Sequence, residues 1–153
     1  MAGFTVVTKN AEETQALAAR LAKILKPNAV LCLFGDLGTG KTTFVKGIAE
    51  GLKIKKDDVH SPTFVLMNIY EGKLPLFHFD LYRLDNAHEI EVIGYEEFLY
   101  GDGVSVIEWA EKMGDLLPKE RLDIRLDHLK EGRRIRIDSG VQRYQRTLRK
   151  LES

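Results

Sequence analysis

The segment from residue 35 to residue 42 restricts the fold of this 153-residue chain more than any other segment does. It reads GDLGTGKT and fits the pattern G-x-x-x-x-G-K-[ST] at every fixed position. The continuous apolar run Ala29–Phe34 precedes it, as expected of a strand that is buried on both faces. A helical pattern follows, from about Lys41 to Leu52. A buried strand, a glycine-rich turn and a helix in this order predict an α/β domain.

Each residue type in this turn suits the binding of phosphate groups. Glycine allows positive φ, so successive backbone N–H groups can point inward at phosphate oxygens. The helix that follows adds unpaired N–H groups and the positive end of its dipole. Lys41 supplies a positive charge for the β- and γ-phosphates, and the Thr42 hydroxyl is a ligand for Mg²⁺. The sequence therefore predicts ATP and Mg²⁺ as cofactors. The nucleotide-binding residues expected from this turn are Gly35, Asp36, Leu37, Gly38, Thr39, Gly40, Lys41, Thr42 and Thr43.

A Mg²⁺ site beside such a turn also needs acidic groups, and the ends of two expected strands supply them. Asp80 ends the run Leu74–Asp80, which is the position of a Walker B acid. Glu108 follows the run Val104–Ile107, as a metal ligand or as the base toward the attacking water. The alternatives are a loop aspartate that caps the next segment and a solvated glutamate at a strand end. The residues predicted to be catalytic are Lys41, Asp80 and Glu108, and the predicted metal ligands are Thr42, Asp80 and Glu108. Which carboxylate lies nearer the metal is left open.

The loop Ser61-Pro62-Thr63 precedes another strand-like run. A hydroxyl in such a loop is suited to sense the γ-phosphate, as switch loops do in other P-loop proteins. Thr63 is therefore added to the expected nucleotide-binding residues, although an ordinary turn is the simpler interpretation. Trp109, directly after Glu108, is expected to be a half-buried core residue that shields the acid from water.

The remaining patterns place this unit in a larger mixed sheet. Helical patterns cover residues 10–25, 86–99 and 142–151, and strand patterns cover residues 3–7, 63–70, 74–80, 104–107, 121–126 and 133–138. Turns at residues 71–73 and 130–132 make two hairpins. We therefore expect an α/β, P-loop NTPase-like three-layer fold with a parallel core and antiparallel hairpins. One P-loop ATPase domain spans residues 1–153 and ends in a basic helix at about residues 141–151.

Composition limits the classes of function. Lys plus Arg and Asp plus Glu are equal at 23 each, whereas a generic nucleic-acid binder normally carries a basic excess. Arg143, Arg146, Arg149 and Lys150 nevertheless recur at helical spacing near the end of the chain. A contact with tRNA is one interpretation of that face, and a solvated surface helix is the simpler one. A single cysteine, Cys32, the lack of a secretory leader and the lack of a long apolar segment predict a cytoplasmic protein with no membrane association.

Motifs that the sequence lacks narrow the class further. It contains no Asn-Lys-x-Asp segment for reading guanine and no Ser-Gly-Gly-Gln signature of transport-type ATPases. It also lacks the Arg-rich lid that small-molecule kinases close over a phosphate acceptor. An ATPase is therefore favoured. The alternative is a nucleotide-gated binding module with negligible hydrolysis, in which ATP orders a surface for a partner.

Four motifs, in their order and spacing, resemble the bacterial TsaE family over nearly the whole chain. They are the phosphate-binding turn, Ser61-Pro62-Thr63, the run HFDLYR at residues 78–83, and Glu108-Trp109. The resemblance implies a cytoplasmic ATPase that hydrolyses ATP slowly when alone. It also implies binding to a TsaB–TsaD complex, which transfers threonylcarbamoyl to the adenosine beside the tRNA anticodon. The ATPase would reset that complex between turnovers.

The resemblance also implies roles for individual residues. Lys41 and Thr42 match the phosphate and Mg²⁺ groups, and Thr63 matches a switch-like loop. Asp80 matches a Walker B-like acid and Glu108 a Mg²⁺-linked acid. The family also implies that residues 8–12 border the adenine and that Arg133 approaches the nucleotide. The basic segment after residue 138 is less typical of the family.

Overall fold

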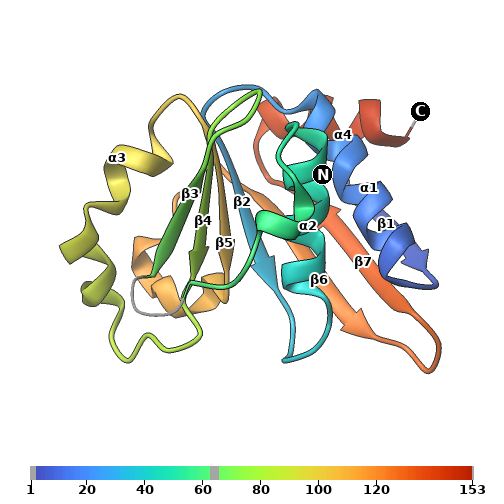
Figure 1. Ribbon diagram of the computed structural model, residues 1–153, viewed down its shortest axis with the longest axis horizontal. Coiled ribbons are helices and arrows are strands. Elements are labelled where there is room, and N and C mark those ends of the chain that lie inside the picture. The colour runs from blue at the N-terminus through green and yellow to red at the C-terminus, as the bar shows by residue number, and fades with distance from the viewer. Residues whose placement is uncertain (1–2, 63–65, 153) are drawn as a thin grey trace.

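The computed structural model describes residues 3–62 and 66–152 and arranges seven strands in one mixed sheet (Figure 1). The strand order is β1-β7-β6-β2-β5-β4-β3. The parallel centre consists of β4, β5, β2 and β6, and β1–β7, β7–β6 and β3–β4 are antiparallel pairs. The strands are β1 Gly3–Thr8, β2 Ala29–Phe34, β3 Met67–Tyr70, β4 Leu76–Asp80, β5 Val104–Glu108, β6 Leu122–His128 and β7 Arg133–Asp138. The fold class expected from the sequence is confirmed.

Two hydrophobic cores lie on the two faces of this sheet, and β2 contributes to both. Every residue of β2 is buried. Leu31 and Leu33 belong to the core that includes α1 (Ala11–Ile24), α2 (Lys41–Gly51) and α4 (Gln142–Glu152). Residues 30, 32 and 34 belong to the other core, with the 3₁₀ segments η2 (Ala87–Ile93) and η3 (Ala110–Leu116) and helix α3 (Tyr95–Leu99). Alternating side chains of a strand covered on both faces explain the continuous apolar run.

The first helix begins at Ala11, one residue after the start of its predicted pattern, because Asn10 is its N-cap. Asn10 accepts a hydrogen bond from the Glu13 N–H at 2.8 Å, which satisfies an orphan donor of the first turn. The Glu13 carboxylate reaches back to the N–H of Lys9 at 2.9 Å, one residue earlier than a capping box requires. Helix α2 packs closely on α1 at Gly47, where an added Cβ would lie 2.5 Å from the Gln15 carbonyl oxygen.

The segment 86–99 differs from its predicted single helix. Gly94 adopts φ +70°, which separates the 3₁₀ segment η2 from the short helix α3. A left-handed residue cannot continue a right-handed helix, so one apolar pattern serves two short elements. Two further 3₁₀ segments, η1 (Lys56–Asp58) and η3, arise where the sequence predicts loops.

The second strand of the first hairpin, β4, also begins later than the predicted run of residues 74–80. β4 starts at Leu76 because Pro75 has no N–H for the ladder. Its neighbour β3 starts at Met67, and residues 63–65 of the predicted strand lie outside the described residues. Within the described chain, no helix combines the length and apolar character required to span a membrane.

Helix α4 is held to the sheet by its apolar face and by one buried hydroxyl. Tyr144, Leu148 and Leu151 are buried. The Tyr144 hydroxyl accepts from the N–H of Val30 at 3.0 Å, just before the pairing of β2 with β6 begins. Arg143 donates to the Pro27 carbonyl at 3.0 Å. Arg143, a member of the predicted basic face, therefore helps to pack the helix.

Tyr144→Phe should lower the free energy of unfolding by about 1–3 kcal/mol at neutral pH, because a buried backbone N–H loses its acceptor. Burial raises the pKa of Tyr144 above its usual 10.0, although the bond from Val30 acts in the opposite direction. The folded state therefore binds the phenolic proton more tightly, and this stabilisation is present below pH 10 and is lost as the pH rises through the folded pKa.

The difference in the free energy of unfolding between the wild type and Tyr144→Phe should consequently become smaller above about pH 10. Urea unfolding across a pH series measures it. The exposed Tyr100 provides the control, since Tyr100→Phe should change stability little at any pH. A gap that stays constant into the alkaline range would contradict the role given to the Tyr144 hydroxyl.

Candidate functional site

The turn between β2 and α2 folds tightly around its own backbone at the carboxyl edge of the parallel strands. Gly35 and Gly40 have φ values of +151° and +101°, which glycine adopts at low cost. A Cβ on Gly35 would lie 2.5 Å from the carbonyl oxygen of Leu126 in β6. The Thr39 hydroxyl donates to the carbonyl of Asp36 at 2.8 Å. Both glycines that the pattern fixes are therefore needed for the backbone conformation and close packing of the turn before α2.

The Lys41 ammonium group lies across the mouth of this turn. Its Nζ donates to the carbonyl oxygens of Gly35 at 2.5 Å and Asp36 at 2.9 Å. The same atom lies 3.9 Å from the centre of the Trp109 ring, at the distance of a cation–π contact. Burial lowers the pKa of Lys41, and the nearby acids, Glu108 foremost, act in the opposite direction. The side chain is only 5% exposed, so the cation is held in place before any ligand arrives.

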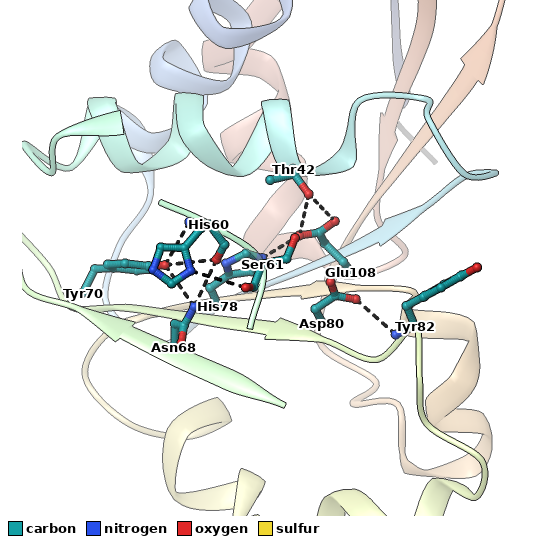
Figure 2. Close-up of polar contacts among 9 residues, drawn as sticks. All are labelled: Thr42, His60, Ser61, Asn68, Tyr70, His78, Asp80, Tyr82 and Glu108. Atoms are coloured by element: carbon teal, nitrogen blue, oxygen red, sulfur yellow. Dashed lines mark hydrogen bonds and ion pairs between the residues drawn. The ribbon is translucent and has the colours of Figure 1, made fainter. Parts of the chain in front are cut away.

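A chain of polar contacts runs from the first turn of α2 into the sheet (Figure 2). The Thr42 hydroxyl lies 3.0 Å from Oε1 and 3.2 Å from Oε2 of Glu108. Oε2 of Glu108 is also 2.5 Å from Nε2 of His78, on the neighbouring strand β4. Glu108 is 3% exposed and His78 is fully buried. The carboxylate is therefore fixed between a helix and a strand.

Asp80 ends β4 directly beside Glu108, its partner in the parallel register. Its Oδ1 accepts a hydrogen bond from the N–H of Tyr82 at 3.1 Å. Burial raises the pKa of Asp80, and the negative charge of Glu108 raises it further, whereas the Tyr82 bond acts in the opposite direction. Two acids at neighbouring strand ends make a place where a cation is favoured.

These groups face one cavity of about 570 Å³, and a second cavity of about 230 Å³ adjoins it. Gly40 and Thr43 line both. The larger cavity contains Lys41, Thr42, Asp80, Glu108, Trp109 and the loop residues Ser61 and Pro62. The smaller one is bordered by residues 9–11 at the start of α1 and by Arg133 of β7.

Arg133 connects the smaller cavity to the glycine-rich turn after β2. Its Nε donates to the carbonyl of Thr39 at 3.1 Å, and Nη2 donates to that of Gly38 at 3.2 Å. A third donor, Nη1, reaches the carbonyl of Gly132 at 2.8 Å. The guanidinium fork therefore fixes the outer half of the turn against the hairpin of β6 and β7.

The structure brings together most of the side chains that the sequence singles out. Lys41, Thr42, Asp80 and Glu108 meet in the larger cavity, and Thr43 lies between the two cavities. The side chains of Asp36 and Leu37 are exposed at the tip of the turn. Thr63 lies outside the described residues, so the prediction of its role stays a prediction.

Two contacts of the site were not predicted, that of His78 with Glu108 and that of Trp109 with Lys41, and both join segments that lie far apart in the sequence. His78 shares a face of β4 with Asp80 because side chains alternate along a strand, a signal that could have indicated it. The placing of Trp109 over Lys41 has no local signal. Trp109 is half-buried, as the sequence predicts, but its φ of +59° is unusual for a bulky residue.

Comparisons with known proteins give one consistent result. The family model for threonylcarbamoyl adenosine biosynthesis protein TsaE matches residues 8–135. The tRNA threonylcarbamoyladenosine biosynthesis protein TsaE of Bacillus subtilis is 50% identical over 118 residues, which cover 76% of this chain and 73% of that protein. The protein of the same name from Treponema pallidum is 41% identical over 128 residues, covering 84% of this chain and 94% of its own. The crystal structure of Bacillus subtilis YdiB superposes with a TM-score of 0.84 and 38% identity, covering 99% of this chain and 95% of that one.

Asp80→Asn should raise the free energy of unfolding at neutral pH. The folded-state pKa of Asp80 is raised, so the folded protein binds its proton more tightly than the unfolded chain, and wild-type stability falls as the pH rises from 3.8 through the folded pKa. Asparagine has no charge to bury, and its Oδ1 can still accept from Tyr82.

The stability gained by Asp80→Asn should therefore become smaller as the pH is lowered toward 3.8. Urea unfolding of the two proteins at several pH values measures this change. Asp115→Asn, at an exposed acid of η3, is the control and should have little effect. A loss of stability on Asp80→Asn at neutral pH would show that the carboxylate stabilises the fold and is not a strained functional group.

Proposed function

This chain belongs to the TsaE family of threonylcarbamoyl adenosine biosynthesis proteins, and on that premise we propose that it is a Mg²⁺-dependent ATPase. The relatives are named for the biosynthesis of tRNA threonylcarbamoyladenosine. The observation that supports the proposal best is the convergence of Lys41, Thr42 and Glu108 at the amino end of α2. That convergence joins a phosphate-binding turn to a buried carboxylate in one cavity.

Phosphate binding follows from the turn and the start of α2. The amino end of an 11-residue helix offers unpaired N–H groups and a positive partial charge to an anion. Lys41 adds a full positive charge, already dehydrated by burial. A triphosphate competes with two backbone carbonyls for this ammonium group, and charged phosphate oxygens are the stronger acceptors.

The oxygen-rich end of the cavity fits Mg²⁺. Among the described residues, no three His, Cys, Asp or Glu side chains form a metal cluster by themselves. Mg²⁺ needs no such cluster, because it usually takes one or two carboxylates and completes its shell with phosphate oxygens and waters. Thr42, Glu108 and Asp80 are therefore the residues that would hold it. When bound, the ion would neutralise the charge that develops on the phosphates.

Glu108 is the residue best placed to act on the attacking water. Its carboxylate is buried, fixed from two sides, and lines the cavity that holds Lys41. Trp109, the next residue, lines the same cavity with its ring 5.0 Å from that of Tyr82, and the two rings would limit access of bulk water. A base of this kind orients the water and accepts its proton as the bond to phosphorus forms.

The smaller cavity is the place for the nucleoside. It continues from the turn past Thr43 and is bordered by residues 9–11 and Arg133. The family resemblance implies that residues 8–12 border the adenine and that Arg133 approaches the nucleotide. The two cavities together thus accommodate the two ends of ATP, with Gly40 and Thr43 between them.

The proposed partner is a TsaB–TsaD complex in the cytoplasm. Leu37 and Tyr82, which line the larger cavity, are 67% and 47% exposed, so two large apolar side chains border the proposed nucleotide site. A protein that covers this rim would respond to the occupant of the cavity. Contact with tRNA would arise through that complex or through the outer side of α4, where Arg146 is exposed.

Lys41→Ala should weaken the binding of MgATP at least tenfold, which corresponds to about 1.4 kcal/mol, because the phosphates lose their nearest cation. Isothermal titration calorimetry measures the change, and Lys46→Ala on the same helix is the charge-matched control. Thermal unfolding should show that both variants are folded. Unchanged affinity in folded Lys41→Ala would contradict the proposed phosphate site.

Glu108→Gln should leave the binding of ATP in the presence of a chelator largely intact and weaken the response to Mg²⁺, because one proposed carboxylate ligand is lost. It should also slow hydrolysis by about 10²–10⁴-fold, the usual contribution of a general base. Phosphate release is measured with and without the TsaB–TsaD complex. The exposed Glu111 provides the control, because Glu111→Gln keeps the site intact. Wild-type protein that binds the complex only with ATP, and releases no phosphate, would favour a nucleotide-gated binding module instead.

A further inference from the structure

His78 is a fully buried polar residue that the proposed reaction leaves without a role. It lies in β4, and Figure 2 shows its ring directed at the carboxylate of Glu108 on β5. The Nε2–Oε2 distance is 2.5 Å. Among the described side chains, Nδ1 of His78 is the one buried polar atom that has no hydrogen-bond partner.

The surroundings of the two ring nitrogens determine where the proton lies. An ionised carboxylate only accepts hydrogen bonds, so Nε2 must carry the hydrogen that is shared with Glu108. A second proton on Nδ1 would create a buried N–H without an acceptor. The contacts therefore indicate a neutral ring with its hydrogen on Nε2. This N–H donates to one acceptor, the Glu108 carboxylate.

Packing alone does not explain a histidine at this position. Its register partners are the apolar core residue Val106 on β5 and Asn68 on β3, whose side-chain amide donates to His60 and Tyr70. Leu76, two residues earlier on β4, is also an apolar core residue. An apolar side chain of similar size would fill the space without leaving Nδ1 unsatisfied, which costs about 1–3 kcal/mol. A residue that costs stability and touches one functional group is expected at a functional site.

We propose that His78 is a positioning residue for Glu108. Its Nε2–H holds Oε2, so the carboxylate cannot rotate away from Thr42 and the cavity. A glutamate has three rotatable side-chain bonds, and one neutral donor fixes its end without cancelling its charge. The chemistry is that of the outer-shell groups that orient metal-binding carboxylates and histidines. This inference rests on the proposed function, because it gives Glu108 its task.

The test compares two substitutions of His78. His78→Leu removes the donor, and His78→Gln retains an N–H near the position of Nε2. His78→Leu should lower the apparent affinity for Mg²⁺ in the presence of ATP by about 10–100-fold, the usual effect of losing an outer-shell partner. His78→Gln should recover most of that loss. The affinity for ATP in the presence of a chelator should stay at the wild-type value in both, because the turn and Lys41 are untouched.

Calorimetric titration of Mg²⁺ into the ATP-bound protein gives the affinity, and phosphate release follows as a second measurement. Ser105→Ala is the matched control, since this buried hydroxyl of β5 donates to the Phe98 carbonyl at 3.3 Å, away from the cavity. The control should leave the Mg²⁺ response unchanged. The thermal midpoint of His78→Leu should be no lower than that of the wild type.

A third readout needs neither nucleotide nor activity. Long-range ¹H–¹⁵N spectra of the wild-type protein should show His78 as the neutral form protonated at Nε2. A ring protonated at Nδ1 would overturn the inference, and so would a wild-type Mg²⁺ response in His78→Leu. If His78→Leu lost ATP binding in the presence of a chelator and also had a lower thermal midpoint, His78 would have a structural role instead. Wild-type protein that binds no MgATP would reject the proposed function, whereas the spectra would still test the His78–Glu108 bond.

Discussion

The contact between Glu108 and Thr42 is the point at which the sheet and the amino end of α2 meet through polar groups. The two residues are separated by 66 positions in the chain, and the parallel pairing of β2 with β5 places them side by side. That pairing aligns the carboxyl ends of the strands, which is where open α/β sheets bind their ligands. If β5 moved by one residue in register, Glu108 would turn to the opposite face. The two apolar cores, one on each side of β2, are what hold this register.

The same edge of the sheet concentrates features that cost stability. Asp80 and Glu108 are like charges at adjacent strand ends, Lys41 is buried, and Trp109 has a left-handed backbone. Each unfavourable feature touches the larger cavity. Features of this kind persist only where the surrounding structure determines them, as the packed sheet does here. These costly features thus lie at the same place as the motif, while two other non-glycine residues with positive φ, Asn28 and Lys53, lie elsewhere.

The sequence predicts the elements well where one local signal dominates. Ala29–Phe34 is found with the expected bounds, and the turn and helix after it follow from glycine and lysine at fixed spacing. The pattern at residues 86–99 misleads because apolar spacing does not show how far a positive φ at Gly94 interrupts a helix. The contacts of His78 with Glu108 and of Lys41 with Trp109 join distant segments. Only the strand order brings those residues together, and periodicity along one segment carries no information about it.

The strand order also divides the site between the two halves of the sheet. On one side of β2, strands β4 and β5 end in the acids Asp80 and Glu108. On the other side, β7 provides Arg133, whose donors fix the carbonyls of Gly38 and Thr39. The glycine-rich turn, which follows β2 between them, is therefore held by a cation on one flank and faces carboxylates on the other. Because a chain with equal numbers of acidic and basic residues has a weak overall field, this local separation of charge would be what orients the proposed nucleotide, with the proposed metal toward β4 and β5.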